Sequence, residues 1–397
     1  MQPAPLHIVH FHNGSGGGVL SVIRNLLLYR QHEAIQNQVI YTINQDTVKH
    51  FELPGLHGAV SEQVFYYSPR WNFYHTCKQL AKLLPDENAV VVAHDWLELG
   101  MVSNLGLQNP LVHVLHGDFD YYYELAIRHS HVVDAYICIS PTIFKSLKQK
   151  LPSRQESIFY LKFPVPGMMP KQRLEASLRI IYFVKDLKDE RKQFSTILEV
   201  ANQLSDCAGD YFFTIAGGGI NAKEFFERWP APMKDRVRFA GLQTSEEMSQ
   251  LLSEQDIFLL PSLSEGFPVA LVEAMKSGVV PLVTNWHGAV EELVTQAVTG
   301  YYFKPGAASD YVLCIKHLRA NQDLLERLSK NCISRANEFF DPVINTKLLE
   351  EVFIRVYDQE GKHKHAAKAY GSRLDKPWLP NWTTKLLRTL SPKNLQL

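Results

Sequence analysis

The chain has 397 residues, 46% of them hydrophobic and 21% charged, which is typical of a globular protein long enough for two α/β domains. Lys plus Arg and Asp plus Glu both number 41, so the overall charge gives no reason to expect a nucleic-acid-binding protein. Five scattered cysteines without a C-x-x-C pair argue against a disulfide framework or a zinc site and suit a reducing compartment.

The N-terminal sequence MQPAPLHIVHFHNGSGGG has no basic stretch followed by a long apolar core, so we expect no signal peptide. No run approaches the roughly eighteen uninterrupted apolar residues of a membrane-spanning helix. We therefore expect a cytoplasmic protein.

Short apolar runs alternate with amphipathic stretches in the first part of the chain. Residues 6–11 predict a strand, residues 14–18 a loop, and residues 19–29 a helix. Further strands are predicted at residues 38–42, 89–93, 111–115 and 135–139. This alternation predicts a parallel sheet covered on both faces.

The pattern pauses at residues 163–170 (FPVPGMMP), where three prolines and a glycine exclude regular structure, and then restarts. A helix is predicted at residues 194–204, and strands are predicted at residues 179–184, 211–216, 237–240, 257–260 and 279–283. Two such units predict two Rossmann-like domains facing a cleft, with ligands beyond the carboxyl ends of the strands. The predicted boundaries are 1–165 and 166–345, with a C-terminal helix and tail at 346–397 that pack back across the domains.

Residues 361–397 contain eight Lys or Arg but one acidic residue, Asp375, and include Trp378 and Trp382. One interpretation is a final helix and a solvated tail, because charge runs are usually solvated. The other is a basic and aromatic surface that touches anionic headgroups or a lipid-linked substrate. The sequence leaves both interpretations open.

Residues 261–278 (PSLSEGFPVALVEAMKSG) place a polar loop after a strand, Pro268 where a first helical residue is expected, and Gly278 at the helix end. A helix N-terminus with free backbone N–H groups at this edge of the sheet suits a diphosphate. Glu265 precedes those donors and Glu273 lies over a turn into the helix. One carboxylate can thus meet a sugar ring and the other ribose hydroxyls. The alternative is an ordinary capped helix with incidental glutamates.

This segment carries a resemblance to a known family. Residues 265–273 (EGFPVALVE) match the E-x7-E motif of glycosyltransferase family 4, whose members are retaining enzymes with the GT-B fold. The resemblance runs over roughly residues 6–356 with the motifs in the family's order. It implies an α/β GT-B fold with an acceptor-side first domain and a nucleotide-sugar-binding second domain. It also implies transfer of a sugar from a UDP- or GDP-sugar to a saccharide or lipid-linked acceptor, without a metal or other cofactor.

Other stretches resemble further motifs of the family, namely Gly16–Gly18, residues 94–96 (HDW), 114–117 (VLHG), 187–193 (LKDERKQ), 214–219 (TIAGGG) and 281–294 (PLVTNWHGAVEELV). The resemblance implies catalytic roles for His116, Glu265 and Lys192. It implies donor contacts at Gly17, Gly18, Lys185, Arg191, Gly217, Gly218, Gly266, Phe267, Val269, Ala270 and Glu273. Asp95, Asp118 and Tyr121 are expected on the acceptor side. Structural alternatives stay open for a lone histidine, for a helix cap with a packed tryptophan at HDW, and for glycine-rich turns.

The phosphate-binding stretch departs from the family pattern. The G-R-L that precedes the family's lysine reads Lys185-Asp186-Leu187 here, so an aspartate stands where an arginine is expected. An aspartate would repel a diphosphate unless it points away. Lys185 or Arg191 could replace the arginine, although a lysine lacks its two-pronged geometry.

Asp118-Phe119-Asp120 matches the D-x-D pattern that binds a divalent metal in the other major glycosyltransferase fold. Two acidic residues make a poor metal site unless they share the ion with a diphosphate, and this pair lies in the first half of the chain. We therefore predict loop or acceptor contacts and no metal. The aromatic residues 121–123 could stack on an acceptor sugar or pack under the loop.

The sequence leaves two rival functions open. One is a sugar-nucleotide epimerase or hydrolase with the same fold. The other is a non-catalytic sugar-nucleotide-binding subunit, which Asp186 suggests and which Glu265, Glu273 and Lys192 together argue against. The sequence does not identify the base, the sugar or the acceptor.

Overall fold

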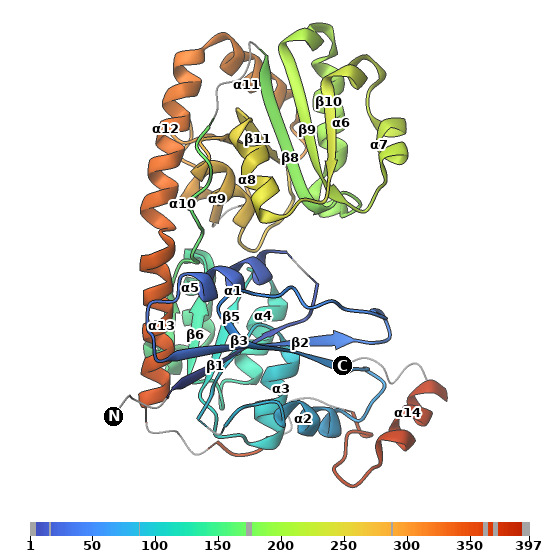
Figure 1. Ribbon diagram of the computed structural model, residues 1–397, viewed down its shortest axis with the longest axis vertical. Coiled ribbons are helices and arrows are strands. Elements are labelled where there is room, and N and C mark those ends of the chain that lie inside the picture. The colour runs from blue at the N-terminus through green and yellow to red at the C-terminus, as the bar shows by residue number, and fades with distance from the viewer. Residues whose placement is uncertain are drawn as a thin grey trace. The chain divides into compact units, whose positions relative to one another are not determined.

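The computed structural model (Figure 1) describes residues 5–15, 17–86, 88–171, 177–286, 289–359, 364–367 and 372–390. The chain forms two compact units. The first unit comprises Met1–Pro164 and Pro342–Leu397, and the second comprises Val165–Asp341. Each unit contains one parallel sheet.

The first sheet has the strand order β3-β2-β1-β4-β5-β6-β7, and all of its described neighbours pair in parallel. Its strands are β1 (Leu6–His12), β2 (Ile35–Asn44), β3 (Ala59–Tyr67), β4 (Val90–Ala93), β5 (Leu111–Leu115), β6 (Ala135–Cys138) and β7 (Ile158–Tyr160). The order reverses between β1 and β4, so the connections that follow these two strands run in opposite directions. A reversal of this kind opens a crevice beyond the carboxyl ends of the two strands.

The helices of the first unit begin with clear local signals. In α3 (Trp96–Leu105), the N-cap Asp95 and Glu98 form a capping box, and in α5 (Pro141–Lys150) the N-cap Ser140 accepts the N–H of Ile143. The other helices are α1 (Gly18–Leu28), α2 (Phe73–Ala81), α4 (Asp120–Arg128), the 3-10 helix η1 (Pro152–Ser157), α13 (Pro342–Asp358) and α14 (Asn381–Leu390).

The C-terminal part of the chain packs on the first unit. Glu350 on α13 accepts the backbone N–H groups of Gln31 and His32 at 3.0–3.1 Å. Further along, buried Lys364 pairs with Asp134 at 2.6 Å. At least one cation of the predicted basic tail is therefore an internal structural group instead of a solvated charge.

The second sheet has the order β10-β9-β8-β11-β12-β13, again parallel, and its order reverses between β8 and β11. Its strands are β8 (Leu178–Asp186), β9 (Tyr211–Gly218), β10 (Val237–Gly241), β11 (Ile257–Leu260), β12 (Val280–Thr284) and β13 (Tyr301–Phe303). The helices of this unit are η2 (Glu190–Lys192), α6 (Phe194–Gln203), η3 (Ser205–Asp210), α7 (Ala222–Arg228), η4 (Ala231–Arg236), α8 (Ser245–Ser253), α9 (Val269–Lys276), α10 (Ala289–Leu293), α11 (Ala308–Ala320) and α12 (Gln322–Phe339).

Alternate residues of the second sheet's strands enter two apolar clusters. Ile180 and Tyr182 of β8 belong to one cluster with α6 and α11, whereas Ile181 and Phe183 belong to the other with α8 and α9. Successive side chains of a strand point to opposite faces, so both faces of this sheet are covered.

The predicted fold class is confirmed: both units are Rossmann-like α/β domains with parallel sheets. The prediction missed β3, β7 and β13, because these strands lie at the edges of their sheets and most of their residues are only partly buried. Among the described residues, none of the helices combines the length and the apolar character needed to cross a bilayer.

Candidate active site

Lys192 and Glu265 meet where the strand order of the second sheet reverses. Lys192 follows β8 and Glu265 follows β11, and the lysine Nζ lies 2.7 Å from both carboxylate oxygens of Glu265. The N–H of Leu263 donates to the carbonyl of Arg191 at 2.8 Å, and Tyr182 donates its hydroxyl to the carbonyl of Lys192 at 2.9 Å. The two loops are thus held together by the backbone as well as by the ion pair. A cation and a carboxylate placed beyond the carboxyl ends of parallel strands suit an anionic ligand that carries hydroxyl groups.

The start of α9 supplies the next elements of the site. Gly266 and Phe267 lie in the loop before it, and the ring of Phe267 packs against Phe340 with centroids 5.3 Å apart. Pro268 is the N-cap and not the first helical residue as predicted, and it makes no side-chain cap. Val269 N donates to Phe267 O at 3.0 Å and Leu271 N donates to Pro268 O at 2.9 Å. The expectation of free N–H groups is therefore wrong for these two, whose bonds to the preceding loop tighten the first turn.

Glu273 lies on α9 one turn after Val269, and Ala270 lies between them. Burial raises the pKa of the Glu273 carboxyl to about 7. A carboxylate in this environment is short of hydrogen-bond donors. Ribose hydroxyls are the donors expected there by the resemblance, and they would lower the cost of its charge.

The glycine-rich turn after β9 packs tightly on β8. A side chain on Gly217 would come within 2.5 Å of the carbonyl oxygen of Val184, and one on Gly218 would contact Leu242. The close approach of the backbone is therefore enough to require glycine at these positions, without any ligand. The turn nevertheless lies at the carboxyl edge of the sheet, where a nucleotide is expected.

Asp186, the residue that departs from the family pattern, ends β8 beside this turn. Its carboxylate accepts the N–H of Lys188 at 2.8 Å and lies against Gly219, where a side chain would meet the Asp186 oxygen. The aspartate thus shapes a local turn and uses one oxygen for the backbone. Lys185, one residue earlier, is exposed.

Arg191 is already paired. Its guanidinium donates to both oxygens of Asp189, at 3.1 Å and 2.7 Å. Most of the arginine side chain is nevertheless exposed, at 65%. The hydrogen bonds from Arg191 hold the pKa of Asp189 below its usual value. Arg191 could meet a phosphate only by sharing its charge with this partner.

In the first unit, His116 follows β5 and His94 follows β4, next to the reversal between β1 and β4. The His94 Nδ1 and the His116 Nε2 lie 2.7 Å apart, so one ring donates a hydrogen bond to the other. The His116 ring also stacks on Phe163, with centroids 5.6 Å apart. His116 is partly buried because these two rings flank it.

Burial keeps both histidines uncharged. It lowers the pKa of His116 to about 3, with His12 as the second cause, and it places the pKa of His94 well below its usual value. A neutral pair of rings can donate or accept a hydrogen bond to a sugar hydroxyl without carrying charge.

The acceptor-side candidates take part in two tyrosine–aspartate pairs in the first unit. Asp95 caps α3 and accepts a short hydrogen bond from the hydroxyl of Tyr121, while Asp118 accepts the hydroxyl of Tyr123. Trp96 stacks on Phe73 with centroids 5.4 Å apart. Asp95 and Trp96 therefore have the capping and packing roles that the sequence left as an alternative, and the Tyr121 side chain is exposed.

A cavity of about 60 Å³ lies in the first unit near the carboxyl ends of β1 and β4. Its lining residues are Phe11, His12, Asn13, Ser15, Val19, Thr42, His94, Asp95, Glu98 and Tyr122. The sequence-based prediction missed His12, Glu98 and the pairing of His94 with His116. Polar residues at the ends of two otherwise apolar strands were the signal that could have identified them.

Gly17 is the N-cap of α1 and Gly18 its first residue. Gly16, His287 and Gly288 lie outside the described residues.

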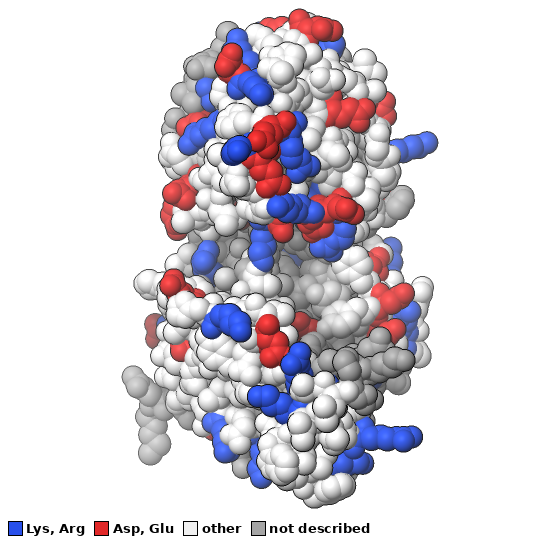
Figure 2. All heavy atoms as spheres, turned by 90° about the vertical axis from the view of Figure 1, so that its right-hand side faces the viewer, with Lys and Arg blue, Asp and Glu red and all other residues white. Residues whose placement is uncertain are grey.

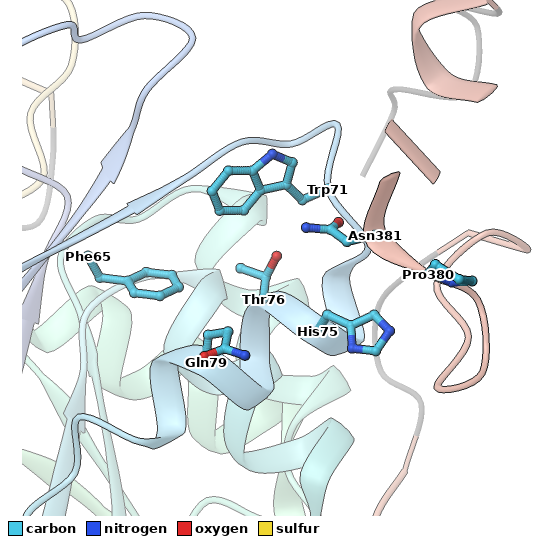
Figure 3. A pocket seen from close by; sticks show the side chains of 7 residues that line it. All are labelled: Phe65, Trp71, His75, Thr76, Gln79, Pro380 and Asn381. Atoms are coloured by element: carbon cyan, nitrogen blue, oxygen red, sulfur yellow. The ribbon is translucent and has the colours of Figure 1, made fainter. Parts of the chain in front are cut away.

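A larger cavity, of about 330 Å³, lies in the first unit between α2, β3 and the start of α14 (Figure 3). Its lining residues are Phe65, Trp71, His75, Thr76, Gln79, Pro380 and Asn381. Aspartate, glutamate, lysine and arginine do not contribute to this lining. The described part of the chain contains no cluster of three or more His, Cys, Asp or Glu placed to hold a metal ion.

Comparison with known proteins places the family resemblance in the second unit. Residues 168–335 match the family model described as Glycosyl transferases group 1. Over 145 residues, 35% of each chain, the protein is 33% identical to the amylovoran biosynthesis glycosyltransferase AmsK of Erwinia amylovora. Over 123 residues, 31% of each chain, it is 30% identical to an N,N'-diacetylbacillosaminyl-diphospho-undecaprenol alpha-1,3-N-acetylgalactosaminyltransferase of Campylobacter jejuni. The first curated relatives are matched over 29–41% of their own length.

Solved structures match much more of the chain. The crystal structure of Anabaena HepE in complex with UDP and glucose is 17% identical, with a TM-score of 0.70 over 88% of this chain and 99% of HepE. At this identity the similarity establishes the fold. The two Rossmann-like units therefore form a GT-B fold, and the match to Glycosyl transferases group 1 covers the unit that contains Lys192, Glu265 and Glu273.

Proposed function

We propose that the protein is a retaining glycosyltransferase that moves a sugar from a nucleoside diphosphate sugar to a saccharide or a lipid-linked acceptor. The observation that carries the proposal is the Lys192–Glu265 pair at the strand-order reversal of the second sheet, inside the residues that match Glycosyl transferases group 1. Ligands of open α/β sheets bind at such a reversal.

The donor in this proposal is a UDP- or GDP-sugar. Lys192 stabilises the negative charge that develops on the departing diphosphate, Glu265 meets the sugar ring, and Glu273 accepts hydrogen bonds from the ribose. In the structure Lys192 is bound to Glu265, so the diphosphate has to share the ammonium group with this carboxylate. The UDP in the HepE structure supports this class of donor.

We propose that the transfer retains the configuration at the anomeric carbon. The acceptor hydroxyl attacks that carbon from the side on which the diphosphate leaves. The bond between the carbon and the diphosphate oxygen breaks, and the hydroxyl proton passes to the diphosphate. The rings of His94 and His116 can orient a sugar hydroxyl by hydrogen bonding, because both imidazoles are uncharged near neutral pH.

The acceptor class is supported by the relatives, one named for amylovoran biosynthesis and one for a diphospho-undecaprenol acceptor. We propose a role in the synthesis of cell-surface polysaccharide or glycoconjugate, in the cytoplasm. The reaction needs no metal in this proposal, because the Lys192 ammonium group supplies the positive charge that a metal ion would otherwise bring to the diphosphate. Contact with a membrane surface through the C-terminal tail completes the proposal.

Isothermal titration calorimetry with UDP and GDP, followed by transfer assays with the preferred donor, tests the function. Binding of one nucleotide together with product formation that requires an acceptor is the expected result. Donor turnover without any acceptor would favour an epimerase or hydrolase, and no binding of either nucleotide would favour a non-catalytic subunit.

A further inference from the structure

The helix α14 (Asn381–Leu390) has its polar side inward and its apolar side outward. Thr384 and Arg388, one turn apart, are buried, whereas Trp382, Leu386 and Leu390 follow one another at four-residue spacing and are exposed. A helix on the surface of a globular domain normally buries its apolar stripe. The orientation of α14 therefore leaves apolar area in water that the fold does not use.

The exposed apolar area extends beyond the helix. Trp378 precedes α14 and is 76% exposed, and Leu390 at its end is 73% exposed, the two highest fractions among the large apolar side chains of the described residues. Leu387 adds to the same side. Isolated exposed apolar residues are common, but a contiguous group that includes two tryptophans marks an interaction surface.

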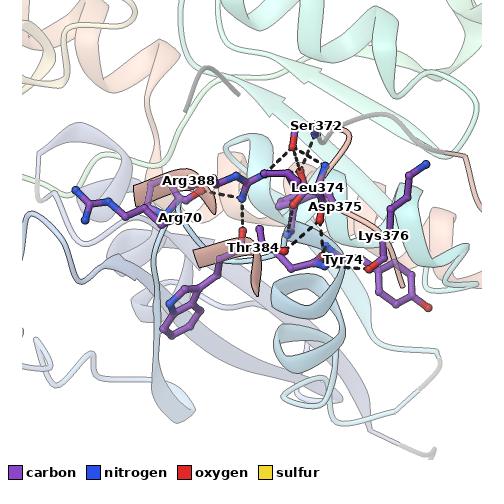
Figure 4. Close-up of polar contacts among 12 residues, drawn as sticks. Arg70, Tyr74, Ser372, Leu374, Asp375, Lys376, Thr384 and Arg388 are labelled. Atoms are coloured by element: carbon purple, nitrogen blue, oxygen red, sulfur yellow. Dashed lines mark hydrogen bonds and ion pairs between the residues drawn. The ribbon is translucent and has the colours of Figure 1, made fainter. Parts of the chain in front are cut away.

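A buried polar network fixes α14 in this orientation (Figure 4). Arg388 donates to Asp375 at 2.6 Å and to the carbonyl of Pro69 at 3.1 Å. Asp375 also accepts the N–H groups of Phe73 and Ser372, both at 2.6 Å. The side chain of Asn72, the N-cap of α2, donates to the carbonyls of Lys376 and Leu379. We will call residues 372–390 the C-terminal clamp.

The hydrogen bonds and the ion pair of this network hold the clamp in one orientation. Turning the apolar side inward would carry Arg388 away from Asp375 and leave this carboxylate buried without its cation, at a high cost in free energy. The outward apolar side is thus a built feature of the fold and not a loosely held end.

The charge of the clamp indicates its partner. Its single acidic residue, Asp375, is buried against Arg388, and the remaining cations, Arg373, Lys376 and Lys385, are exposed or partly exposed. Figure 2 faces the side on which α14 lies in Figure 1, and its lower part shows Lys and Arg side chains beside uncharged surface. Tryptophan and leucine flanked by cations suit the headgroup region of an anionic bilayer.

A second copy of the chain fits this surface less well. In a symmetric dimer through α14 the same patch would meet itself, and the cations of one copy would oppose those of the other. The helix has 10 residues, so it extends about 15 Å, half the thickness of a hydrocarbon core. It can lie in the membrane surface but cannot cross it.

We propose that the C-terminal clamp is a preformed anchor whose exposed side, formed by Trp378, Trp382, Leu386, Leu387 and Leu390, inserts into the headgroup region of an anionic bilayer. Arg373, Lys376 and Lys385 bind the lipid phosphates, each contributing about fivefold in affinity. This deepens the membrane contact in the proposed function, but it does not depend on the donor site, which lies in the other unit.

Flotation of the purified full chain with vesicles tests the anchor. The wild type is expected to float with vesicles of phosphatidylcholine and phosphatidylglycerol, to bind pure phosphatidylcholine less, and to bind less at high salt. The variant Trp382→Ser/Leu386→Ser/Leu390→Ser should lose at least about tenfold in binding. Leu313→Ser, which changes an equally exposed leucine of α11, should bind like the wild type.

A second pair of measurements covers the case in which the triple variant is unstable. Lys376→Glu/Lys385→Glu should weaken binding to the anionic vesicles without changing UDP binding by calorimetry. Brominated lipids should quench the fluorescence of the wild type more than that of Trp382→Phe. A wild type that stays in solution with anionic vesicles overturns the proposal, as does a triple variant that floats equally well. A solution dimer that the triple variant abolishes would assign the surface to a second copy. Failure to bind UDP would count against the donor site and leave the anchor standing.

Discussion

The ion pair between Lys192 and Glu265 leads to a counter-intuitive expectation for Glu265→Gln. The two carboxylate oxygens of Glu265 each lie 2.7 Å from the Lys192 Nζ. A phosphate oxygen bound to the same nitrogen would therefore lie within about 5.5 Å of this carboxylate. Two unit charges at that distance repel by about 3 kcal/mol at an effective dielectric constant of about 20, and by about 0.8 kcal/mol in water. Removing the carboxylate charge should therefore tighten the binding of UDP by at least about fourfold.

Turnover should change in the opposite direction. Glu265 is proposed to meet the sugar ring, so Glu265→Gln should lower kcat with a complete donor while it improves the affinity for bare UDP. Calorimetry at one fixed ionic strength measures the affinity, and initial rates of transfer measure kcat. Glu326→Gln is the matched control, since Glu326 pairs with Lys330 at 2.9 Å on a helix that carries no proposed ligand contact.

Unchanged UDP affinity in Glu265→Gln, measured beside an unchanged control, would show that the Glu265 carboxylate does not repel the bound phosphate. If Lys192→Ala also binds UDP like the wild type, the phosphate does not approach Lys192. If Lys192→Ala binds UDP more weakly, the phosphate contacts the lysine, but the Glu265 charge does not weaken that contact and the expected repulsion is wrong.

Other predictions follow from single residues. Lys192→Ala and Glu273→Ala should each lower kcat/KM by about tenfold or more, roughly 1.4 kcal/mol, and wild-type rates in both variants would contradict the site. Because the pKa of Glu273 is raised to about 7, donor binding should strengthen as the pH rises from 6 to 8, and Glu273→Gln should abolish this dependence in calorimetric titrations. In the native state Glu273 keeps its proton at pH values above its ordinary pKa of 4.5, whereas in the unfolded state it loses the proton. The free energy of unfolding should therefore fall by up to about 3 kcal/mol as the pH rises from 4.5 to 7. In urea titrations, Glu273→Gln should lack this dependence of stability on pH. Asp375→Ala leaves Arg388 buried without its partner and should cost about 3–5 kcal/mol or release the C-terminal clamp, as followed by thermal unfolding and limited proteolysis. A metal chelator should leave the transfer rate unchanged, and loss of activity that a divalent ion restores would contradict the metal-free mechanism.

The sequence predicted those parts of the fold and the site that depend on local spacing. The strand, loop and helix around residues 257–276 could be assigned from the spacing of the apolar residues and from Gly266 and Pro268. All three signals predict a strand, then a loop, then the start of a helix. Glu265 and Glu273 could be selected because they bracket that helix start. The parallel sheets followed from the alternation of strands and helices, whereas edge strand β3 was missed for lack of a fully apolar run.

Contacts between distant parts of the chain could not be predicted in this way. Glu265 pairs with Lys192 across 73 positions of sequence, and the pairing depends on β8 and β11 being neighbours in the sheet. The same is true of His94 and His116, which follow neighbouring strands. The sequence of α14 is amphipathic, and the usual expectation would bury its leucines. That expectation is wrong because Arg388 binds the buried Asp375 on the inner side of the helix. Asp375 lies outside α14, so the periodicity of the helix cannot reveal this partner.

The two units use the same strand-order reversal for different chemistry. In the second unit the reversal between β8 and β11 brings opposite charges together, and each charge lowers the cost of keeping the other in a partly buried loop. In the first unit the reversal between β1 and β4 gathers histidines that burial keeps neutral. A diphosphate needs charge opposite to its own, whereas a sugar hydroxyl needs a hydrogen bond and no charge. The proposed assignment of donor binding to the second unit and acceptor binding to the first therefore rests on paired charges at one reversal and neutral rings at the other.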